Sequence, residues 1–373
     1  MELVEAPSST GPAGHPRRAD FELRPFLERS DAIAAWQITN TLGPLALLWA
    51  AAIWCLSQQP ALVPVVLGLQ MLFLARCFSL MHDCGHGALF RSRRANRWVG
   101  FLLGVLAGIP QLPWSRGHAF HHRHNGDWQL YRGPSALIST DAFAALSPAR
   151  QRLYSWLRHP LMLLPGGFFY LVIKPRLALL LGLADLLPWL VARLGRGPGS
   201  SLPELLRIHR SRHWHSPAEG LDLALNNLAV VGFWLLMGWQ LGVGRFWGLY
   251  APLMTGAAAA FICVFFVQHN FPDSYAHRTE GWSPMAGVLE GTSDLALPPL
   301  LNWFTADIGC HAMHHLCEAI PNYRLRAAHQ RNAHLLGGVR RLGLADIPRC
   351  FACILWDPDA ARLTTIAAQR ARA

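Results

Sequence analysis

The chain has 373 residues, 52% of them hydrophobic, and a mean hydropathy of +0.22. This composition excludes an ordinary soluble enzyme, because several apolar stretches reach the roughly 20 residues that cross a bilayer. The formal net charge of +11 comes mainly from arginine. The arginines flank the apolar stretches, as in "RSRRANR" and "RIHRSR", so they indicate membrane orientation rather than nucleic-acid binding.

The first part of the chain predicts a helical hairpin in the membrane. Residues 1–33 are polar, contain Pro and Gly, and are expected to be flexible. Residues 34–56 carry no charge, and residues 61–80 carry only Arg76. Only "SQQP" separates these two expected spans, so the turn between them is tight.

The middle of the chain holds two weaker apolar segments. Residues 98–114 are short and end in "GIPQLPW". Residues 161–191 are interrupted by Pro165 and two following glycines, by "KPR", and by Asp185. Such runs fit re-entrant or interfacial helices better than complete spans. A protein with six spans is the competing interpretation.

A second hairpin is expected over residues 223–244 and 246–268, around the short turn "GVGR". Because the hairpin turns are almost uncharged and the loops rich in arginine, the N-terminus, residues 81–221 and the C-terminal part are expected in the cytoplasm. The predicted fold is an all-α membrane protein. It has two transmembrane hairpins (four spans), interfacial or re-entrant helices and a cytoplasmic cap. Residues 34–345 form its single domain, and residues 346–373 form a cytoplasmic tail.

Nine of the 18 histidines are grouped at positions that follow the apolar segments. Residues at i, i+3 and i+4 share one face of a helix, so each group can present its imidazoles to a common centre. The hairpin topology brings all of them to the cytoplasmic side. They are His82 and His86 in "HDCGH", His118, His121 and His122 in "HAFHH", His269 in "VQHNF", and His311, His314 and His315 in "HAMHH".

This number of imidazoles exceeds the four ligands of a zinc ion and suits two first-row metals of higher coordination number. The residues alone do not choose among zinc, copper, iron and nickel. No Glu-x-x-His motif occurs, so the carboxylate-rich pattern of soluble di-iron bundles is absent. His124 is interpreted as a non-ligand. Side chains that could orient metal-bound imidazoles are Asp83, Asn125, Asp127, Asn270 and Asp307.

The eight cysteines are scattered and predict reduced thiols rather than a disulfide framework. They form no closely spaced cluster that would ligate a built-in iron–sulfur centre. The Cys350-x-x-Cys353 pair has no partner pair and is interpreted as structural or incidental.

The quoted segments "HDCGHGALF", "HAFHH", "VQHNF" and "LNWFTADIGCHAMHHLCEAIPNYRL" resemble the histidine boxes and flanks of the integral-membrane fatty-acid desaturases. The likeness extends in order and spacing over residues 35–345. It implies that the nine histidines bind two iron ions. The centre would activate O2 and introduce a cis double bond into a long-chain fatty acyl group. The spacing within the first box and the presence of His311 resemble the delta-12/omega-6 type, whereas Ala88 departs from the Ser frequent there.

The resemblance also implies partners. These are an acyl-lipid or acyl-thioester substrate, membrane lipids, and a separate electron donor such as ferredoxin or a small cytochrome. No nucleic-acid partner is expected. Arginine-rich, lysine-poor composition suggests a bacterial source and therefore the inner membrane, with the histidine boxes and both termini cytoplasmic. Side chains near the boxes could line an acyl tunnel or simply pack: Trp114, Phe120, Trp303 and Phe304.

Three alternatives remain at this point. A related histidine-box oxygenase, such as a hydroxylase, carotenoid ketolase or alkane monooxygenase, would carry similar boxes. A membrane metal transporter or sensor is disfavoured because the expected spans contain no His, Asp or Glu. An inactive descendant is disfavoured because every box is intact.

Overall fold

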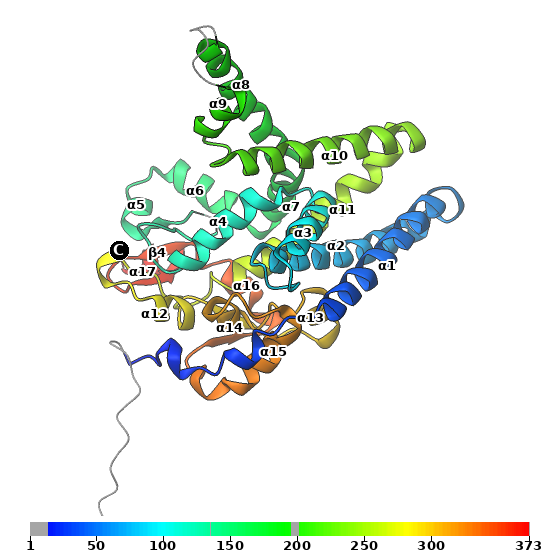
Figure 1. Ribbon diagram of the computed structural model, residues 1–373. Coiled ribbons are helices and arrows are strands. Elements are labelled where there is room, and N and C mark those ends of the chain that lie inside the picture. The colour runs from blue at the N-terminus through cyan, green and yellow to red at the C-terminus, as the bar shows by residue number, and fades with distance from the viewer. Residues whose placement is uncertain (1–13, 135, 195–200, 373) are drawn as a thin grey trace, which may run out of the picture. The chain divides into compact units, whose positions relative to one another are not determined.

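The computed structural model describes residues 14–134, 136–194 and 201–372 (Figure 1). It consists of two compact units, each built from separate parts of the chain, where the sequence predicted one domain over residues 34–345. Both units are mainly helical, as predicted, and contain only short strands. Unit 1 comprises Met1–Arg29, Phe120–Pro160 and Cys263–Ala373, and unit 2 comprises Ser30–Ala119 and Leu161–Ile262.

Unit 2 contains the two predicted hairpins. Helices α1 (Asp31–Gln58) and α2 (Val63–Gly85) pack against each other around a 3-10 turn (Figure 1). Helices α10 (Pro217–Leu241) and α11 (Val243–Val267) meet at Gly242, whose φ of +82° suits glycine. All four are long and apolar enough to cross a membrane. Each predicted span therefore corresponds to one helix, extended by a few residues.

The outer ends of the hairpins lie at one end of unit 2. The backbone N–H of Arg91, just after α2, donates to the carboxylate of Asp31 at the start of α1 (2.8 Å). The Phe78 ring near the end of α2 stacks on the Phe261 ring near the end of α11, with centroids 3.9 Å apart. The end of α2, with its histidines, therefore lies beside the start of α1 and the end of α11.

The predicted re-entrant segment is a pair of helices, α3 (Arg93–Leu106) and α4 (Gln111–His124), bent by 101°. Gly108 turns the chain at the tip with a φ of +72°. A Cβ at Gly104 would lie 2.5 Å from the carbonyl oxygen of Ile109, so the tip closes tightly on α3. The pair is also counted as one candidate span when it is taken as a broken helix.

Polar side chains of other helices satisfy the backbone at this tip. The Arg176 guanidinium donates to the carbonyl oxygen of Gly108 (2.9 Å), and the Asn226 amide donates to that of Ile109 (3.1 Å). The Asp222 carboxylate accepts from the backbone N–H of Leu112 (3.0 Å). Non-helical backbone is tolerated at membrane depth where protein groups bond to it, and these three side chains meet that condition.

The second weak segment forms a longer helix than expected. Residues Pro160–Leu194 run through α7 (Leu163–Phe168), a π-helical turn and α8 (Lys174–Leu194), and they pass as a fifth candidate span. By length and composition the described residues thus contain five candidate spans, or six with the bent pair, where four were predicted and six was the competing interpretation. The breaks at Pro165 and Pro175 do not interrupt the helix, because proline is tolerated near the start of a helical piece.

Contacts along α8 nevertheless place a polar segment beside it. Asp185 in α8 pairs with His209 (3.6 Å), which follows the short helix α9 (Leu202–Ile208). Trp214 lies against Gly182, where a Cβ would be 2.0 Å from the indole ring. A chain segment with charged residues that packs on the middle of α8 favours the predicted interfacial position over a full crossing.

Unit 1 surrounds two apolar clusters. The first contains a stacked pair, Trp128 and Trp356 (centroids 4.5 Å), and the second contains Met313, Leu316 and Leu325. Two small sheets border them: β1 (Ile138–Ser139) with β4 (Leu355–Asp357) and β5 (Arg362–Thr364), and β2 (Ser293–Leu295) with β3 (Arg340–Leu342). The helices are α5 (Thr140–Ala144), α6 (Pro148–Leu157), α12 (Pro284–Leu289), α13 (Pro299–Phe304), α14 (His311–Leu316), α15 (Asn322–Arg331), α16 (Ile347–Cys350) and α17 (Ile366–Arg372).

The described part of the N-terminal segment is not the flexible tail that the sequence predicted. Phe21 is buried in the second cluster. The Asn332 side chain accepts from the backbone N–H of Glu22 (2.8 Å) and donates to its carbonyl oxygen (3.1 Å), as a neighbouring strand would. The ring of Phe21 and the amide of Asn332 thus help to hold residues 14–29 in unit 1, together with ion pairs such as Arg331–Glu22 (2.5 Å). Residues 1–13 lie outside the described residues.

The C-terminal residues are likewise part of unit 1 rather than a tail. Cys350 and Cys353 are buried, and β4 pairs with both β1 and β5. The indole N–H of Trp356 donates to the carbonyl oxygen of Ala276 (2.7 Å). The buried run is "CILW" (353–356), and it precedes the polar residues 357–373. All eight cysteines have free thiols.

Candidate metal centre

Unit 2 brings together three of the predicted ligands. His82 lies in the last turn of α2, His86 caps that helix, and His118 lies on α4. Their ring centroids are 4.6 to 5.0 Å apart, and their nearest ring nitrogens lie within 4.8 Å of one another. The indole of Trp114 stacks on His118 with centroids 4.7 Å apart. The imidazoles are therefore packed together, with an aromatic ring on one side.

Unit 1 brings together the other six. Ring nitrogens of His121, His269 and His315 lie within 4.8 Å of one another, and all three rings are buried. His311 joins this group through its Nε2 atom, 2.9 Å from Nε2 of His269. The remaining two form a pair whose Nε2 atoms are 3.1 Å apart: His122 and His314.

Helix α4 connects the two groups along the chain. It carries His118, His121 and His122 at spacing i, i+3 and i+4, so these residues share one helical face as predicted. His118 belongs to unit 2, and the other two belong to unit 1. The helix that follows the re-entrant tip thus supplies ligands to both parts of the predicted site.

The backbone around α14 is fixed by a carboxylate that the sequence analysis missed. Asp294 accepts from the backbone N–H of Ala312, the second residue of α14 (3.1 Å), and its other oxygen lies 2.5 Å from Nε2 of His329. This bond anchors the helix that starts at His311. No local signal marks the role of Asp294, because its partners are 18 and 35 residues away.

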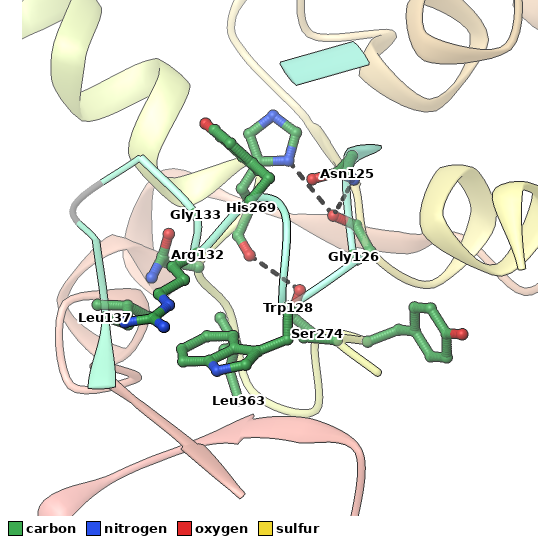
Figure 2. Close-up of a pocket in the computed structure, with 14 residues that line it drawn as sticks. Asn125, Gly126, Trp128, Arg132, Gly133, Leu137, His269, Ser274 and Leu363 are labelled. Carbon is green, nitrogen blue, oxygen red and sulfur yellow. Dashed lines mark hydrogen bonds between the residues drawn. The ribbon is translucent and has the colours of Figure 1, made fainter. Parts of the chain in front are cut away.

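Hydrogen bonds select the tautomer of two predicted ligands. Nδ1 of His269 faces the carbonyl oxygen of Gly291 (3.3 Å), so it carries the proton and leaves the Nε2 lone pair available for a metal. The Asn125 amide donates to the same oxygen (3.0 Å), as Figure 2 shows. Nδ1 of His82 faces the carboxylate of Asp83 at 3.3 Å. Asn125 and Asp83 therefore lie where orienting side chains were predicted, although Asn125 acts through a carbonyl group.

The other candidates for orienting side chains bond elsewhere. The Asp307 carboxylate pairs with Arg326 (2.9 Å) and is bonded by the amide of Asn302. Asp127 accepts from the hydroxyl group of Thr279 (2.8 Å). Asp307 and Asp127 thus have structural partners and no hydrogen bond to a histidine among the bonds of the described chain. Glu318, not singled out in the sequence, lies 3.7 Å from Nδ1 of His122.

A cavity of about 20 Å³ adjoins His269 and Asn270 (Figure 2). This volume suffices for a single water molecule. The Asn270 amide donates to the carbonyl oxygen of Cys353 (3.2 Å), while its buried Oδ1 has no hydrogen-bond partner among the described residues. A polar atom left in this way favours a bound water or ion beside His269.

Burial keeps the central imidazoles neutral. Burial lowers the pKa of His269 to about 3, opposed in part by the carbonyl group of Gly291. Burial lowers the pKa of His315 well below its ordinary value, and the neighbouring imidazoles, His122 first, lower it further. A neutral imidazole is the form that binds a metal ion, so the group needs no deprotonation at neutral pH.

The donor set fits a first-row metal. Both ring nitrogens of His315 are buried and have no hydrogen-bond partner in the part of the chain that is described. An unpaired buried donor or acceptor costs about 1–3 kcal/mol, and a metal–nitrogen bond would remove that cost. The group of His121, His269 and His315 offers nitrogen ligands alone, which suits zinc, copper, iron or nickel.

His124 and the predicted tunnel residues lie outside both metal groups. The His124 ring packs against Phe120 (centroids 4.4 Å) and faces Trp282 (6.4 Å). Trp303 and Phe304 pack edge to face on each other. Trp114 is in ring contact with two predicted ligands, His82 (centroids 5.9 Å) and His118 (4.7 Å).

Comparison with known proteins places these features in a family. The family described as fatty acid desaturase matches residues 57–342. A fatty acid desaturase of Bacillus subtilis is 29% identical over 328 residues, which cover 87% of this chain and 83% of the relative. An sn-1 acyl-lipid omega-3 desaturase (ferredoxin) of Synechocystis sp. is 25% identical, over 75% of this chain and 69% of its own length. An sn-1 oleoyl-lipid 12-desaturase of the same organism is 28% identical, with coverage of 69% and 64%.

The match covers every histidine group described above and extends over most of both units. The chain therefore belongs to the fatty acid desaturase family.

Proposed function

We propose that this enzyme introduces a cis double bond into a long-chain acyl group of a membrane lipid, with two iron ions held by the nine histidines and O2 as the oxidant. The observation that carries the proposal is the close packing of imidazoles in both units, most of them buried. Six of the nine come from the two H-x-x-H-H boxes, whose spacing alone groups them in the sequence, and the chain belongs to the fatty acid desaturase family.

The reaction removes one hydrogen atom from each of two neighbouring methylene groups. Two electrons from a donor protein and two protons complete the reduction of O2 to two water molecules. Bound iron would supply the oxidising power that an unactivated C–H bond requires. The protein supplies ligands of fixed tautomer, as at His269, and a buried site that excludes bulk water.

The chain also offers groups that would position the substrate. Phe78, Trp114 and Phe261 form a continuous series of ring contacts that reaches His118. Apolar rings beside a ligand provide a surface for a methylene chain and no hydrogen-bond partner for water. A 1 Å change in the position of the reacting carbons has a large effect on rate, so these rings are expected to influence where the double bond forms.

The relatives suggest the donor and the substrate class. One relative is named as an acyl-lipid desaturase that uses ferredoxin, and another as acting on an oleoyl lipid. We infer an acyl-lipid substrate and a ferredoxin-type donor for this enzyme, with a small cytochrome as the alternative donor. The free thiols, scattered along the chain, provide no iron–sulfur centre of its own.

The enzyme is a multi-pass membrane protein. We infer that it lies in the bacterial inner membrane, with both termini and the histidines on the cytoplasmic side. The exposed arginines that precede α3 and α10, and the nearly uncharged hairpin turns, support this orientation. Four complete spans, with α3–α4 re-entrant and α8 interfacial, return the chain to the same side before each histidine box.

Analysis of fatty acids in a heterologous host tests the proposal. Gas chromatography–mass spectrometry with double-bond localisation would compare cells that make the intact enzyme with cells that make His314→Ala. A new unsaturated acyl group that appears only with the intact enzyme supports desaturation. A hydroxylated or oxo product would instead assign the enzyme to the related oxygenases, which carry similar boxes.

A further inference from the structure

The segment between α9 and α10 carries a concentration of positive charge that the proposed reaction does not use. We call residues 207–215 the basic loop; its sequence is "RIHRSRHWH". The side chains of Arg207, Arg210 and Arg212 are exposed. None of the three forms an ion pair or hydrogen bond through its side chain within the described chain. Glu204, the nearest acidic residue along the chain, is also exposed and does not neutralise them.

The basic loop is nevertheless held in place. His209 is buried, pairs with Asp185 of α8 (3.6 Å) and contacts the Trp189 ring (centroids 5.0 Å). Trp214 is 7% exposed and fills the space against Gly182. At the other end, the backbone N–H of His215 donates to the carboxylate of Glu219 (3.0 Å). The loop is thus anchored at both ends on α8 and α10.

Burial alternates along the loop. His209 and Ser211 are buried, whereas Arg210 and Arg212 between and after them are exposed. The backbone at His209 is extended, with φ −61° and ψ 134°. Successive side chains of an extended segment point to opposite sides, and the alternate burial of residues 209–212 leaves both arginines on the exposed side of the loop. The anchors on one side therefore fix a pair of guanidinium groups on the other.

Exposed apolar side chains surround these charges. On α9, Leu202, Leu206 and Ile208 are 38 to 51% exposed. On α8, Leu187 and Val191 are 55% and 71% exposed. A surface that offers apolar side chains and arginines side by side is typical of segments at a membrane interface. A soluble acidic protein would match the charges and leave the apolar side chains in water.

We propose that the basic loop binds the headgroup phosphate of anionic phospholipids, while the exposed apolar side chains of α8 and α9 contact their acyl chains. Guanidinium groups donate paired hydrogen bonds to phosphate oxygens. Basic residues near a membrane surface each strengthen binding to anionic lipids severalfold, so three together predict a preference over zwitterionic lipids of roughly a hundredfold. Because the loop is anchored on α8 and α10, a lipid bound at the loop would also affect these two helices, whose side chains bond to the re-entrant tip.

Lipid titration of the intact, purified protein tests this site. Native mass spectrometry would count bound phosphatidylglycerol and phosphatidylcholine for the wild type and for R207Q/R210Q/R212Q. We expect the preference for phosphatidylglycerol to fall at least tenfold in this variant. R207K/R210K/R212K keeps the charge and should retain most of the preference. The matched control, R340Q/R341Q/R349Q, removes three exposed arginines of unit 1 and should bind as the wild type does.

Three results would overturn the proposal. The first is an unchanged preference in R207Q/R210Q/R212Q with helix content equal to that of the wild type. The second is displacement of phosphatidylglycerol by inorganic phosphate at constant ionic strength, which would indicate a site for free phosphate. The third is loss of ferredoxin binding, measured with the intact variant, without any change in lipid preference, which would make the loop a docking site for the electron donor.

Discussion

The Nε2 atoms of His269 and His311 lie 2.9 Å apart, and both side chains are almost fully buried. His269 has its Nδ1 proton directed at a carbonyl group, so its Nε2 is a bare lone pair. Without a metal, the Nε2 atom of His311 donates a proton to that lone pair. With a metal present, the two Nε2 atoms would bind the same ion. The pair thus connects the residue after α11 to the helix α14, and a bound metal would connect them more strongly.

Removal of one central predicted ligand is expected to abolish iron binding at its site and to lower turnover by more than about a hundredfold. The reason is that loss of a residue that only orients a ligand already lowers metal affinity or activity by about 10–100-fold. His315→Ala is the most direct change, because both nitrogens of this buried ring have no protein partner in the described chain. Iron per protein and product formation measure the effect. The matched control is His124→Ala, which removes a ring packed on Phe120 outside both groups. Normal iron content in His315→Ala would show that this residue is not a ligand.

The bonds at the re-entrant tip predict a loss of stability when Arg176 is changed. Arg176→Met leaves the carbonyl groups of Gly108 and Leu171 without their donor (both 2.9 Å). Hydrogen bonds from charged groups contribute roughly 1.5–3 kcal/mol, and partial exposure of the side chain reduces this to about 1–2 kcal/mol. Thermal unfolding in detergent measures the change. Arg176→Lys should lose less. A variant Arg176→Met that unfolds as the wild type does would show that water or lipid replaces the donor.

Packing at the same tip makes Gly104 sensitive to substitution. In Gly104→Ala the new Cβ would lie 2.5 Å from the carbonyl oxygen of Ile109, which is backbone and cannot rotate away. Overpacking of this kind costs roughly 1–3 kcal/mol. Gly232→Ala in α10 is the control, since nothing lies within 4 Å of its Cβ and alanine favours a helix by about 1 kcal/mol. The free energies of unfolding should therefore change in opposite directions. Equal changes in the free energy of unfolding of the two variants would contradict the tight packing at the tip.

The two hydrogen bonds between Asn332 and Glu22 predict that Asn332→Leu releases the N-terminal segment. The change removes both bonds from a side chain that is 1% exposed and leaves the Glu22 backbone unpaired. Hydrogen–deuterium exchange should become faster over residues 20–24 and remain slow in α1. The exposed salt bridge Arg324–Glu28 contributes little, so Arg324→Gln serves as the control. Unchanged exchange in Asn332→Leu would show that the segment is held without these two hydrogen bonds.

The buried thiols of unit 1 predict a pH dependence. Burial raises the pKa of Cys310 and Cys353 to about 12 and that of Cys350 to about 11. The folded protein therefore keeps these protons between about pH 9, where unfolded thiols ionise, and pH 11. Stability should fall as the pH rises through this window. Alkylation by iodoacetamide at pH 8.5 should be slow until denaturant is added. Rapid alkylation of these cysteines in the folded protein would contradict this account.

Hydrophobic length and histidine spacing were sufficient to predict the hairpins and the grouping of the histidines. A run of about 20 uncharged residues in lipid has few alternatives to a helix. The three histidines of an H-x-x-H-H motif lie on the same face of a helix. The boundaries of α1 and α2 were accordingly predicted to within a few residues. At residues 161–191 the interruptions by Pro and Gly indicated an interfacial helix, and the helical path is longer than expected because it continues past Pro165 and Pro175 to Leu194.

Long-range partners were not predictable. Asp294 orders α14 through residues 18 and 35 positions away, and Asn332 holds a segment 310 residues away in sequence. Neither pairing follows a helical or strand period, so nothing local marks it. Asp307 was a reasonable candidate beside His311, but the guanidinium of Arg326 lies closer to it than any imidazole does.

The central claim is that this histidine centre desaturates an acyl chain, and one measurement tests it most directly. Purified, iron-loaded enzyme in proteoliposomes would receive a deuterium-labelled acyl-lipid, ferredoxin and its reductase, and the products would be analysed by mass spectrometry. The account predicts a product that has lost two hydrogen atoms from neighbouring carbons, formed by the wild type and by His124→Ala but not by His315→Ala. A product that gains an oxygen atom, or equal desaturation by His315→Ala, would contradict it.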